Sequence, residues 1–270
     1  MSPKARPMMG KLSLVNGVRQ EQVVNVAAAK PARAILRRGK KESLYIILEV
    51  TGATVGRERI YREMLRIIGE EYFQVRGSVT TKLRQAIGAA NAFLLQENLS
   101  ALPHQQRAGG VTCAVLRAGN VYIAQAGPTT AYVSYQGQLS SFPETPIAEL
   151  TAEEATPLGF KTGLPIRFYR SKMGVGDVLL LTSGCLAREV SQQQIAQAVV
   201  GKDVDLALAN LEGLAGEGDA SAMLIRVAPV QARPTVEPET ARRPVRREAE
   251  PKAVRRPARP SVEAPVRPRP

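Results

Sequence analysis

The side chains that most often carry out chemistry in proteins are few in this sequence and widely spaced. Cys113 and Cys185 are the only cysteines of the 270 residues, and His104 is the only histidine. Two cysteines cannot form a metal cluster, and His104 lies in a polar stretch with no cysteine or second histidine nearby. We therefore expect two reduced thiols, buried or half-buried, and a solvated loop histidine that is neither a ligand nor a base.

A second place where chemistry could occur is the short loop after residues 178–181. These four residues are apolar, too few for a helix and bounded by turn residues, so they predict a buried strand. Thr182, Ser183 and Gly184 end that strand, and Ser191 is a helix-capping residue before a predicted helix over residues 192–200. A small-residue loop between a strand and a helix is about equally common as a functional site and as a plain connector.

The formal net charge of +13 suggests acidic partners, but the charge is concentrated in a few segments instead of being spread over the chain. Basic residues concentrate at residues 4–6, at residues 37–41 and after Gln231. Charge in such segments indicates loose electrostatic partners, such as nucleic acid or an anionic surface, more than it describes the fold.

Composition divides the chain into three parts. Residues 1–11 are basic and contain Pro and Met, so we expect a disordered N-terminus. Residues 12–228 carry the apolar content of a folded domain. Residues 229–270 are mostly Pro, Arg, Ala, Val and Glu, and we expect a disordered basic tail that is a linker, a ligand for another module or a truncated connection. Without a signal-peptide core or a membrane-spanning run, the chain is expected to be cytoplasmic.

The elements that must position any site follow from hydrophobic period and turn residues. Strands are predicted at residues 12–18, 23–28, 43–50, 111–116, 121–126, 131–135, 166–171, 178–181 and 220–227. Amphipathic helices are predicted at residues 60–72, 83–94, 192–200 and 204–214. The turns after residues 116 and 126 are short, which predicts an antiparallel meander of three strands. Residues 166–171 are expected to pair with residues 178–181.

Four segments of the predicted domain share the order and residue types of one known family. They read LYIILEVTG (44–52), VYIAQAGPTTAYVSYQGQL (121–139), GDVLLLTSGCL (176–186) and GDASAMLIRV (218–227). They resemble LFVVADGMG, VANVGDSRAYLYRDGKL, GDRLLLCSDGL and SDNITVVVVRV of the metal-dependent protein phosphatases (PPM, the type 2C serine/threonine phosphatases). The resemblance spans residues 12–228. It implies an α+β fold of two packed antiparallel β-sheets flanked by helices on both faces (αββα).

The resemblance also implies a chemistry. PPM phosphatases hold two Mg²⁺ or Mn²⁺ ions that activate a bridging water for attack on phosphoserine or phosphothreonine. Two divalent cations that lie close together repel each other strongly, so several carboxylates must offset their charge. Arg19 matches the arginine that the family places near the phosphate.

Most of those carboxylates are absent from this sequence. The positions that depart from the family pattern are Val23, Val24, Glu49, Val50, Pro128, Gly184, Cys185 and Ala220. Asp219 keeps its carboxylate, and Glu49 could coordinate a metal from a displaced position because it is one methylene longer than aspartate. Glu21 would join them only if the alignment slipped by one turn. The residual metal candidates are thus Glu49 and Asp219, and no cofactor is expected.

The leading hypothesis is a pseudophosphatase, a PPM-like domain without catalysis that serves as a regulatory or protein-binding module. Its partner would be a phosphoprotein or a kinase, with Arg19 and the basic residues 37–41 as phosphate contacts. The first alternative is a weakly active serine/threonine phosphatase that uses Mg²⁺ or Mn²⁺. The second is an adaptor whose basic tail binds nucleic acid or an anionic surface. The sequence leaves enzyme activity, partner identity and oligomeric state open.

Overall fold

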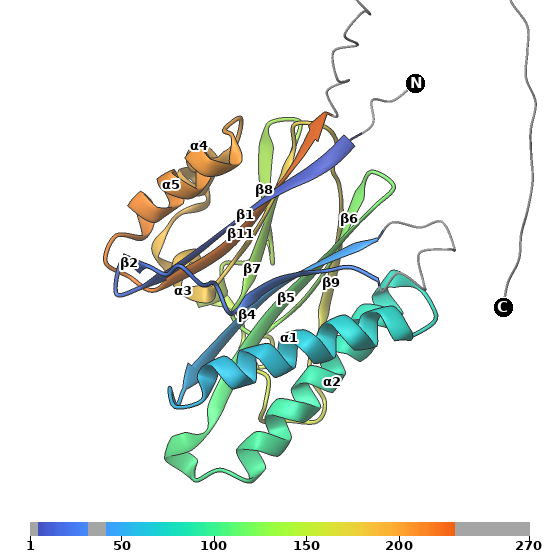
Figure 1. The fold of residues 1–270 in the computed structure, drawn as a ribbon, viewed down its shortest axis with the longest axis vertical. Coiled ribbons are helices and arrows are strands. Elements are labelled where there is room, and N and C mark those ends of the chain that lie inside the picture. The colour runs from blue at the N-terminus through green and yellow to red at the C-terminus, as the bar shows by residue number, and fades with distance from the viewer. Residues whose placement is uncertain (1–4, 32–41, 230–270) are drawn as a thin grey trace, which may run out of the picture. The chain divides into compact units, whose positions relative to one another are not determined.

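The computed structural model describes residues 5–31 and 42–229, and these residues form two β-sheets packed face to face (Figure 1). Sheet A has the strand order β2-β1-β11-β10-β7-β8, and sheet B has the order β3-β4-β5-β6-β9. Every strand pair in both sheets is antiparallel. The strands are β1 Ala5–Val15, β2 Val18–Arg19, β3 Val26–Ala29, β4 Ser43–Gly52, β5 Arg107–Arg117, β6 Asn120–Ala126, β7 Thr130–Tyr135, β8 Gln138–Phe142, β9 Arg167–Lys172, β10 Val178–Thr182 and β11 Ala220–Pro229.

Helices cover the outer face of each sheet, as the αββα prediction requires. The long pair α1 (Arg57–Gln74) and α2 (Val79–Leu99) packs on sheet B, and α3 (Gly184–Glu189), α4 (Gln192–Val199) and α5 (Val204–Ala215) pack on sheet A. A third apolar cluster fills the space between the sheets. The fold class is therefore α+β with two antiparallel sheets between helical layers. No helix of the described residues is both long and apolar enough to cross a membrane.

Local sequence explains where these elements begin and turn. The side chain of Ser78 accepts from the backbone N–H of Thr81 at the start of α2, and Ser191 forms a capping box with Gln194 at the start of α4. The two-residue turn Asn16-Gly17 has positive φ at both positions and joins Val15 to Val18, the pairing typical of a type I′ hairpin. The four predicted helices are confirmed.

The predicted disorder of residues 1–11 is wrong for residues 5–11, which form the first half of β1 and pair with β11 as far as Pro229. Pro7 argued against a strand here, because proline is excluded from central strands. It is tolerated in β1 because its missing N–H faces no partner strand. The folded part thus includes Pro229, the first residue of the predicted tail. The rest of that tail, and the basic residues 37–41, lie outside the described residues.

The predicted meander is also wrong at its third strand. β5 pairs with β6 in sheet B, but the chain crosses to sheet A at Gly127-Pro128-Thr129, and β7 pairs with β8 and β10 there. The expected pairing of residues 166–171 with 178–181 fails for the same reason, because β9 pairs with β6 and β10 with β7 and β11. A short turn between strands fixes neither their sheet nor their partner.

Candidate functional site

Glu49 lies near the C-terminal end of β4, on the face of sheet B that looks toward sheet A. Its neighbours Leu48 and Val50 point the other way, into the helix-covered core. The Glu49 carboxylate is only 7% exposed. Its Oε2 accepts a hydrogen bond of 2.5 Å from the backbone N–H of Gly184, and its Oε1 lies 3.5 Å from Cys185 Sγ. The carboxylate thus connects sheet B to the loop that follows β10 in sheet A.

Gly184 allows this contact because it has no side chain. A Cβ on Gly184 would lie 2.2 Å from the carbonyl oxygen of Pro128 and 3.0 Å from Glu49 Oε2. Pro128 itself packs against Gly110, where a Cβ would lie 2.7 Å from the proline ring. The backbone carbonyl of residue 128 therefore leaves no room for a side chain at position 184, and an aspartate there does not fit this backbone.

Cys185 and Arg188 complete the surroundings of the Glu49 carboxylate. Arg188 Nη2 lies 4.0 Å from Glu49 Oε1 and 3.5 Å from Cys185 Sγ. Burial is the main cause that raises the pKa of the Cys185 thiol, and the negative charge of Glu49 adds to it, while Arg188 opposes both. The thiol is therefore a protonated donor toward Glu49 at neutral pH. Cys113 is fully buried in the core of sheet B, and both thiols are free.

Asp219 has a structural partner of its own. Its Oδ1 accepts a hydrogen bond of 2.7 Å from the backbone N–H of Asn16, in the turn between β1 and β2. Asp219 is exposed, and no hydrogen bond joins its carboxylate to Glu49. The structure thus uses Asp219 to hold the Asn16-Gly17 turn, and its carboxylate is not shared with that of Glu49.

Arg19 pairs with Glu212 of α5 at 2.9 Å, and both side chains are substantially exposed, 51% and 34%. Two family ligand positions nearby are Val23, which packs against the core between the sheets, and the exposed Val24. Glu21 is exposed and lines a pocket with Arg19, and no hydrogen bond joins it to Glu49. The predicted site residues Arg19, Glu49 and Asp219 therefore have three separate hydrogen-bond partners, although the charges of Glu49 and Asp219 both raise the pKa of the Cys185 thiol.

These residues do not fit a pair of divalent ions. Mg²⁺ and Mn²⁺ sites need several oxygen ligands around each ion. The described residues contain no group of three or more His, Cys, Asp or Glu side chains that could hold a metal ion. One carboxylate oxygen of Glu49 already accepts the Gly184 N–H, and one of Asp219 accepts the Asn16 N–H. The donor set suits internal hydrogen bonding better than metal coordination.

Two surface pockets lie away from the Glu49 contact. The first, of about 520 Å³, is lined by Lys11, Arg19, Gln20, Glu21 and Val23. The second, of about 660 Å³, lies between the start of α1 and the end of α2 and includes the exposed His104. His104 has no Cys or His neighbour in that lining, as expected for a solvated loop residue. Sequence reasoning missed the Glu49–Cys185 contact, although both positions depart together from the family pattern.

Comparison with solved structures places this fold among PPM-type serine/threonine phosphatases. The catalytic domain of the phosphatase PstP, in complex with two manganese ions, matches with a TM-score of 0.61 at 18% identity, over 83% of this chain and 100% of that chain. The S. agalactiae serine/threonine phosphatase matches with a TM-score of 0.61 at 13% identity, over 82% and 99% of the two chains. PppA of Pseudomonas aeruginosa, a regulatory component of its T6SS, matches with a TM-score of 0.60 at 15% identity, over 83% and 100%.

No protein-family model matches the chain, and no curated protein matches it. At identities below one fifth, the likeness to these structures shows the fold alone.

Proposed function

We propose that this chain is a pseudophosphatase, a PPM-like domain that has lost the metal centre and acts as a regulatory module that binds other proteins. The observation that carries the proposal is the bond from the Gly184 N–H to Glu49 Oε2. It engages the one buried carboxylate at the expected metal position, and Pro128 fills the space beside it. A carboxylate held in this way orders the two sheets instead of a metal ion.

Charge supports the same conclusion. Two adjacent divalent ions carry four positive charges, and Glu49 and Asp219 would supply two negative ones, one of them exposed. Arg188 lies 4.0 Å from Glu49 and already offsets its charge. A cation at Glu49 would have to displace both a backbone donor and a guanidinium.

The proposed binding role rests on the similarity of the fold to protein phosphatases and on Arg19. Relatives of this fold include enzymes named as serine/threonine protein phosphatases, so their substrates are phosphoproteins. We propose that the partner here is a phosphoprotein or a kinase, and that Arg19 provides a phosphate contact when it leaves its exposed pair with Glu212. The basic residues 37–41 are further candidates for that contact.

The test is calorimetric titration of the full chain with Mn²⁺, followed by an aryl-phosphate assay on the same sample. We expect no saturable Mn²⁺ binding in the micromolar range and no turnover above the buffer rate. The PstP catalytic domain, whose structure holds two manganese ions, is the positive control. Metal-dependent turnover that Asp219→Ala abolishes would overturn the proposal in favour of a weakly active phosphatase.

The binding half has a separate test. Anisotropy titrations with a labelled phosphoserine peptide should show saturable binding that Arg19→Ala weakens, whereas the matched control Arg66→Ala on α1 should leave it unchanged. Arg66 is as exposed as Arg19 and also pairs with glutamate, but it lies on the other sheet's helix layer. Equal affinity of the two variants would remove Arg19 from the proposal.

A further inference from the structure

The strand β1 has one side without a partner strand over most of its length. On one side it pairs with β11 from Ala5 to Leu14, and the two strands run together to the end of sheet A (Figure 1). On the other side β2 covers only Leu14 and Val15. Among the described residues no strand pairs with that side of β1 before Leu14. Within residues 5–31 and 42–229, the outer side of β1 is therefore an open sheet edge.

The hydrogen bonds of β11 show which backbone groups of β1 point outward. Ser221 uses both its N–H and its C=O toward Ser183, and Val227 bonds in the same way to Asp177 and Gly176, all on the β10 side. In an antiparallel pair, opposite residues alternate between hydrogen-bonded and non-hydrogen-bonded pairs. The residues of a non-hydrogen-bonded pair point their N–H and C=O groups away from each other, to the outer sides of the two strands. The β1 partners of Ser221 and Val227 are Ser13 and Pro7.

By this alternation, the odd-numbered residues of β1 direct their backbone groups to the open edge. Ser13 confirms the direction, because its C=O accepts from the N–H of Gln20 on the β2 side. Met9 and Lys11 each offer an N–H and a C=O to the edge, and Pro7 offers a C=O alone. An extended chain that pairs with this edge would thus find donors and acceptors from Met9 to Lys11 and one missing donor at Pro7.

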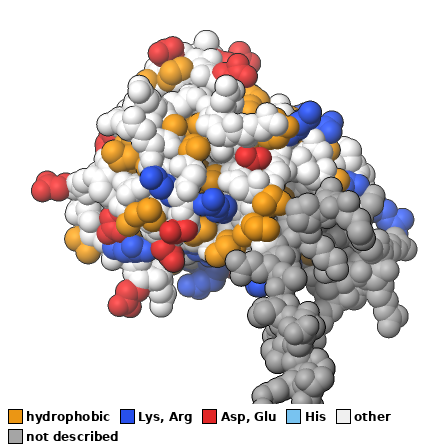
Figure 2. Space-filling view, turned by 90° about the horizontal axis from the view of Figure 1, so that it is seen from above, with side chains coloured by type: hydrophobic (Ala, Val, Ile, Leu, Met, Phe, Trp, Pro, Cys, Tyr) orange, Lys and Arg blue, Asp and Glu red, His pale blue; other side chains and the backbone are white. Residues whose placement is uncertain are grey.

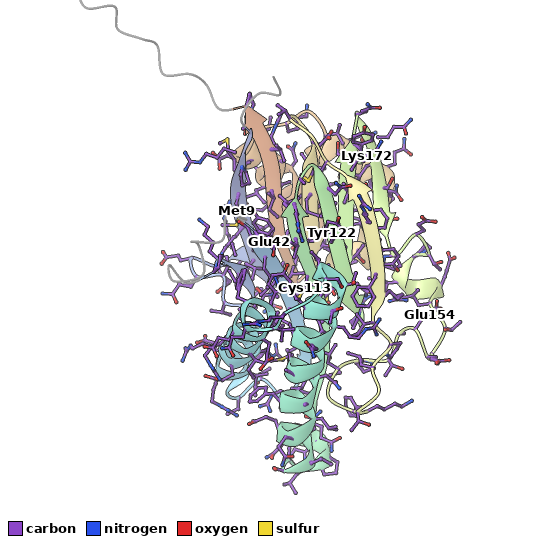
Figure 3. All side chains as sticks on the ribbon, turned by 90° about the vertical axis from the view of Figure 1, so that its right-hand side faces the viewer. Met9, Glu42, Cys113, Tyr122, Glu154 and Lys172 are labelled. Carbon is purple, nitrogen blue, oxygen red and sulfur yellow. The ribbon has the colours of Figure 1, made fainter. Side chains whose placement is uncertain are left out.

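A groove accompanies this edge. The pocket of about 520 Å³ begins at Lys11 and continues along the segment that leads from β2 to β3. β3 is the outermost strand of sheet B on the same side, and Lys11 Nζ donates to the carbonyl oxygen of Val26 in β3 at 3.3 Å. Met8 and Met9 are 52% and 41% exposed, and Met9 lies at the margin of the two sheets (Figure 3). The edge is therefore accessible and has apolar contact area.

The charge beside the edge is positive. β1 and β11 contain Arg6, Lys11 and Arg226 and no carboxylate. The lining of the pocket has two cations, Lys11 and Arg19, against one carboxylate, Glu21. The part of the surface seen in Figure 2 carries both acidic and basic side chains. Two strands that carry basic side chains and no acidic ones favour an acidic partner.

We propose that the open edge of β1 binds an extended acidic segment of a partner protein, which adds to sheet A as an antiparallel or parallel strand beside Met9 and Lys11. Backbone hydrogen bonds would supply affinity, and the cations would select carboxylate side chains. A second copy of this chain is a poorer occupant, because the net charge of +13 repels copies from one another and each Pro7 would meet the partner edge without a donor. This inference goes beyond the proposed function, because it does not involve the Glu49 site and shares with it only Arg19, which lines the adjoining pocket.

Hydrogen exchange tests the geometry first. In the free protein the amides of Met9 and Lys11 should exchange much faster than those of Met8 and Gly10, which face β11. Adding the peptide Thr-Val-Glu-Val-Glu-Val-Glu-Thr should slow Met9 and Lys11 and leave Met8 and Gly10 unchanged. Slow exchange of Met9 and Lys11 without peptide that depends on protein concentration would show a second copy on the edge and overturn the proposal.

Affinity provides the second test, with the same peptide carrying a fluorophore. Met9→Pro removes one outward N–H and should weaken binding about tenfold, the effect of one lost hydrogen bond, while Met9→Ala keeps the N–H and should stay within about twofold. Lys11→Glu should weaken binding, and Lys172→Glu on β9 should not. A peptide with Lys in place of Glu should bind far more weakly.

Equal binding by Met9→Pro and Met9→Ala, or by the acidic and basic peptides, would overturn the proposal. If Met9→Pro does not fold, a peptide N-methylated at alternate residues replaces it, because this leaves the protein unchanged and removes the peptide N–H groups that would donate to the outward carbonyl oxygens of Met9 and Lys11. Loss of peptide binding would leave the Mn²⁺ and turnover results untouched, so the two proposals fail separately.

Discussion

Glu49 and Gly184 are 135 positions apart in the chain and are joined by a hydrogen bond from the Gly184 N–H to the Glu49 carboxylate. The bond connects the end of β4 in sheet B with the start of α3 above sheet A. In a PPM phosphatase both positions would be metal ligands or would lie beside them, as the sequence resemblance implies. Here these two positions contact each other directly across the two sheets.

Replacing Glu49 tests the structural role of its carboxylate. Glu49→Ala leaves the Gly184 N–H and the Cys185 thiol without an acceptor in a buried place, and should lower the free energy of unfolding by about 1–3 kcal/mol. Glu49→Gln keeps an acceptor and should cost about 1 kcal/mol. Urea denaturation measures both. Equal losses for the two variants would contradict a hydrogen-bonding role.

Gly184→Ala tests the packing against Pro128. Its Cβ would lie 2.2 Å from the Pro128 carbonyl oxygen, so the backbone must shift, and the variant should lose about 1–3 kcal/mol. Gly88 in the middle of α2 is the matched control, because nothing lies within 4 Å of the place that a Cβ would take there. Gly88→Ala should gain about 0.5–1 kcal/mol. A neutral Gly184→Ala in the same urea series would contradict the close contact between position 184 and the Pro128 carbonyl.

Cys185 should be a slow nucleophile. Burial and then the charge of Glu49 raise its pKa above the ordinary value of 9.0, so iodoacetamide should alkylate it more slowly than a free thiol at pH 8. Glu49→Gln should speed this reaction. Because the folded pKa is the raised one, this thiol adds stability below pH 9.0 that is lost as the pH rises through the folded pKa. Cys113, fully buried, should react only on unfolding, and mass spectrometry of the alkylated peptides distinguishes the two.

The pair Arg19–Glu212 should contribute little to stability. Arg19 is exposed and Glu212 is half-buried at the surface, and such pairs are worth about 1 kcal/mol or less. A double-mutant cycle with Arg19→Ala and Glu212→Ala should therefore give a coupling energy below that value, smaller still at about 1 M salt. A coupling of several kcal/mol would mean that Arg19 is committed to Glu212 and is not available for a phosphate.

Glu42 should matter far more. It accepts from Tyr72 Oη at 3.2 Å and Lys82 Nζ at 3.1 Å, and it lies 3.2 Å from Arg117 Nη1. Glu42→Ala leaves the mostly buried Lys82 unpaired and should cost about 3 kcal/mol by urea denaturation. Glu63→Ala, which breaks only a surface pair with Arg66, should cost less than about 1 kcal/mol. Similar losses would contradict this difference.

Local patterns predicted the helices and several turns of this fold, because each depends on residues within a few positions. The apolar spacing from Ile60 to Tyr72 gives α1, and Gln136-Gly137 forms a turn with positive φ between β7 and β8. Asp177 shows the limit of this locality: it accepts from the nearby N–H of Gly174, which holds the turn before β10, but also from the N–H of Gln136, which is far away in the chain. The order of motifs gave the layer arrangement.

Pairings between distant strands could not be read from local patterns. The crossing at Pro128 moves β7 into the other sheet, and no short-range signal distinguishes this from a hairpin. The contacts of the candidate site could not be predicted for the same reason. The sequence showed that carboxylates are missing, but the partners of Glu49 and Asp219, at Gly184 and Asn16, depend on tertiary packing. Whether any metal binds remains a prediction to be measured.

The position of β11 between β1 and β10 affects the order in which the chain can fold. All strands of sheet B, with α1 and α2, come from residues 26–172, so that layer can assemble while later residues are still being synthesised. Sheet A needs residues 220–229 to join β1 to β10. Until they leave the ribosome, β1 lacks its main partner strand, and nascent chains are open to chaperones and misassembly during that interval.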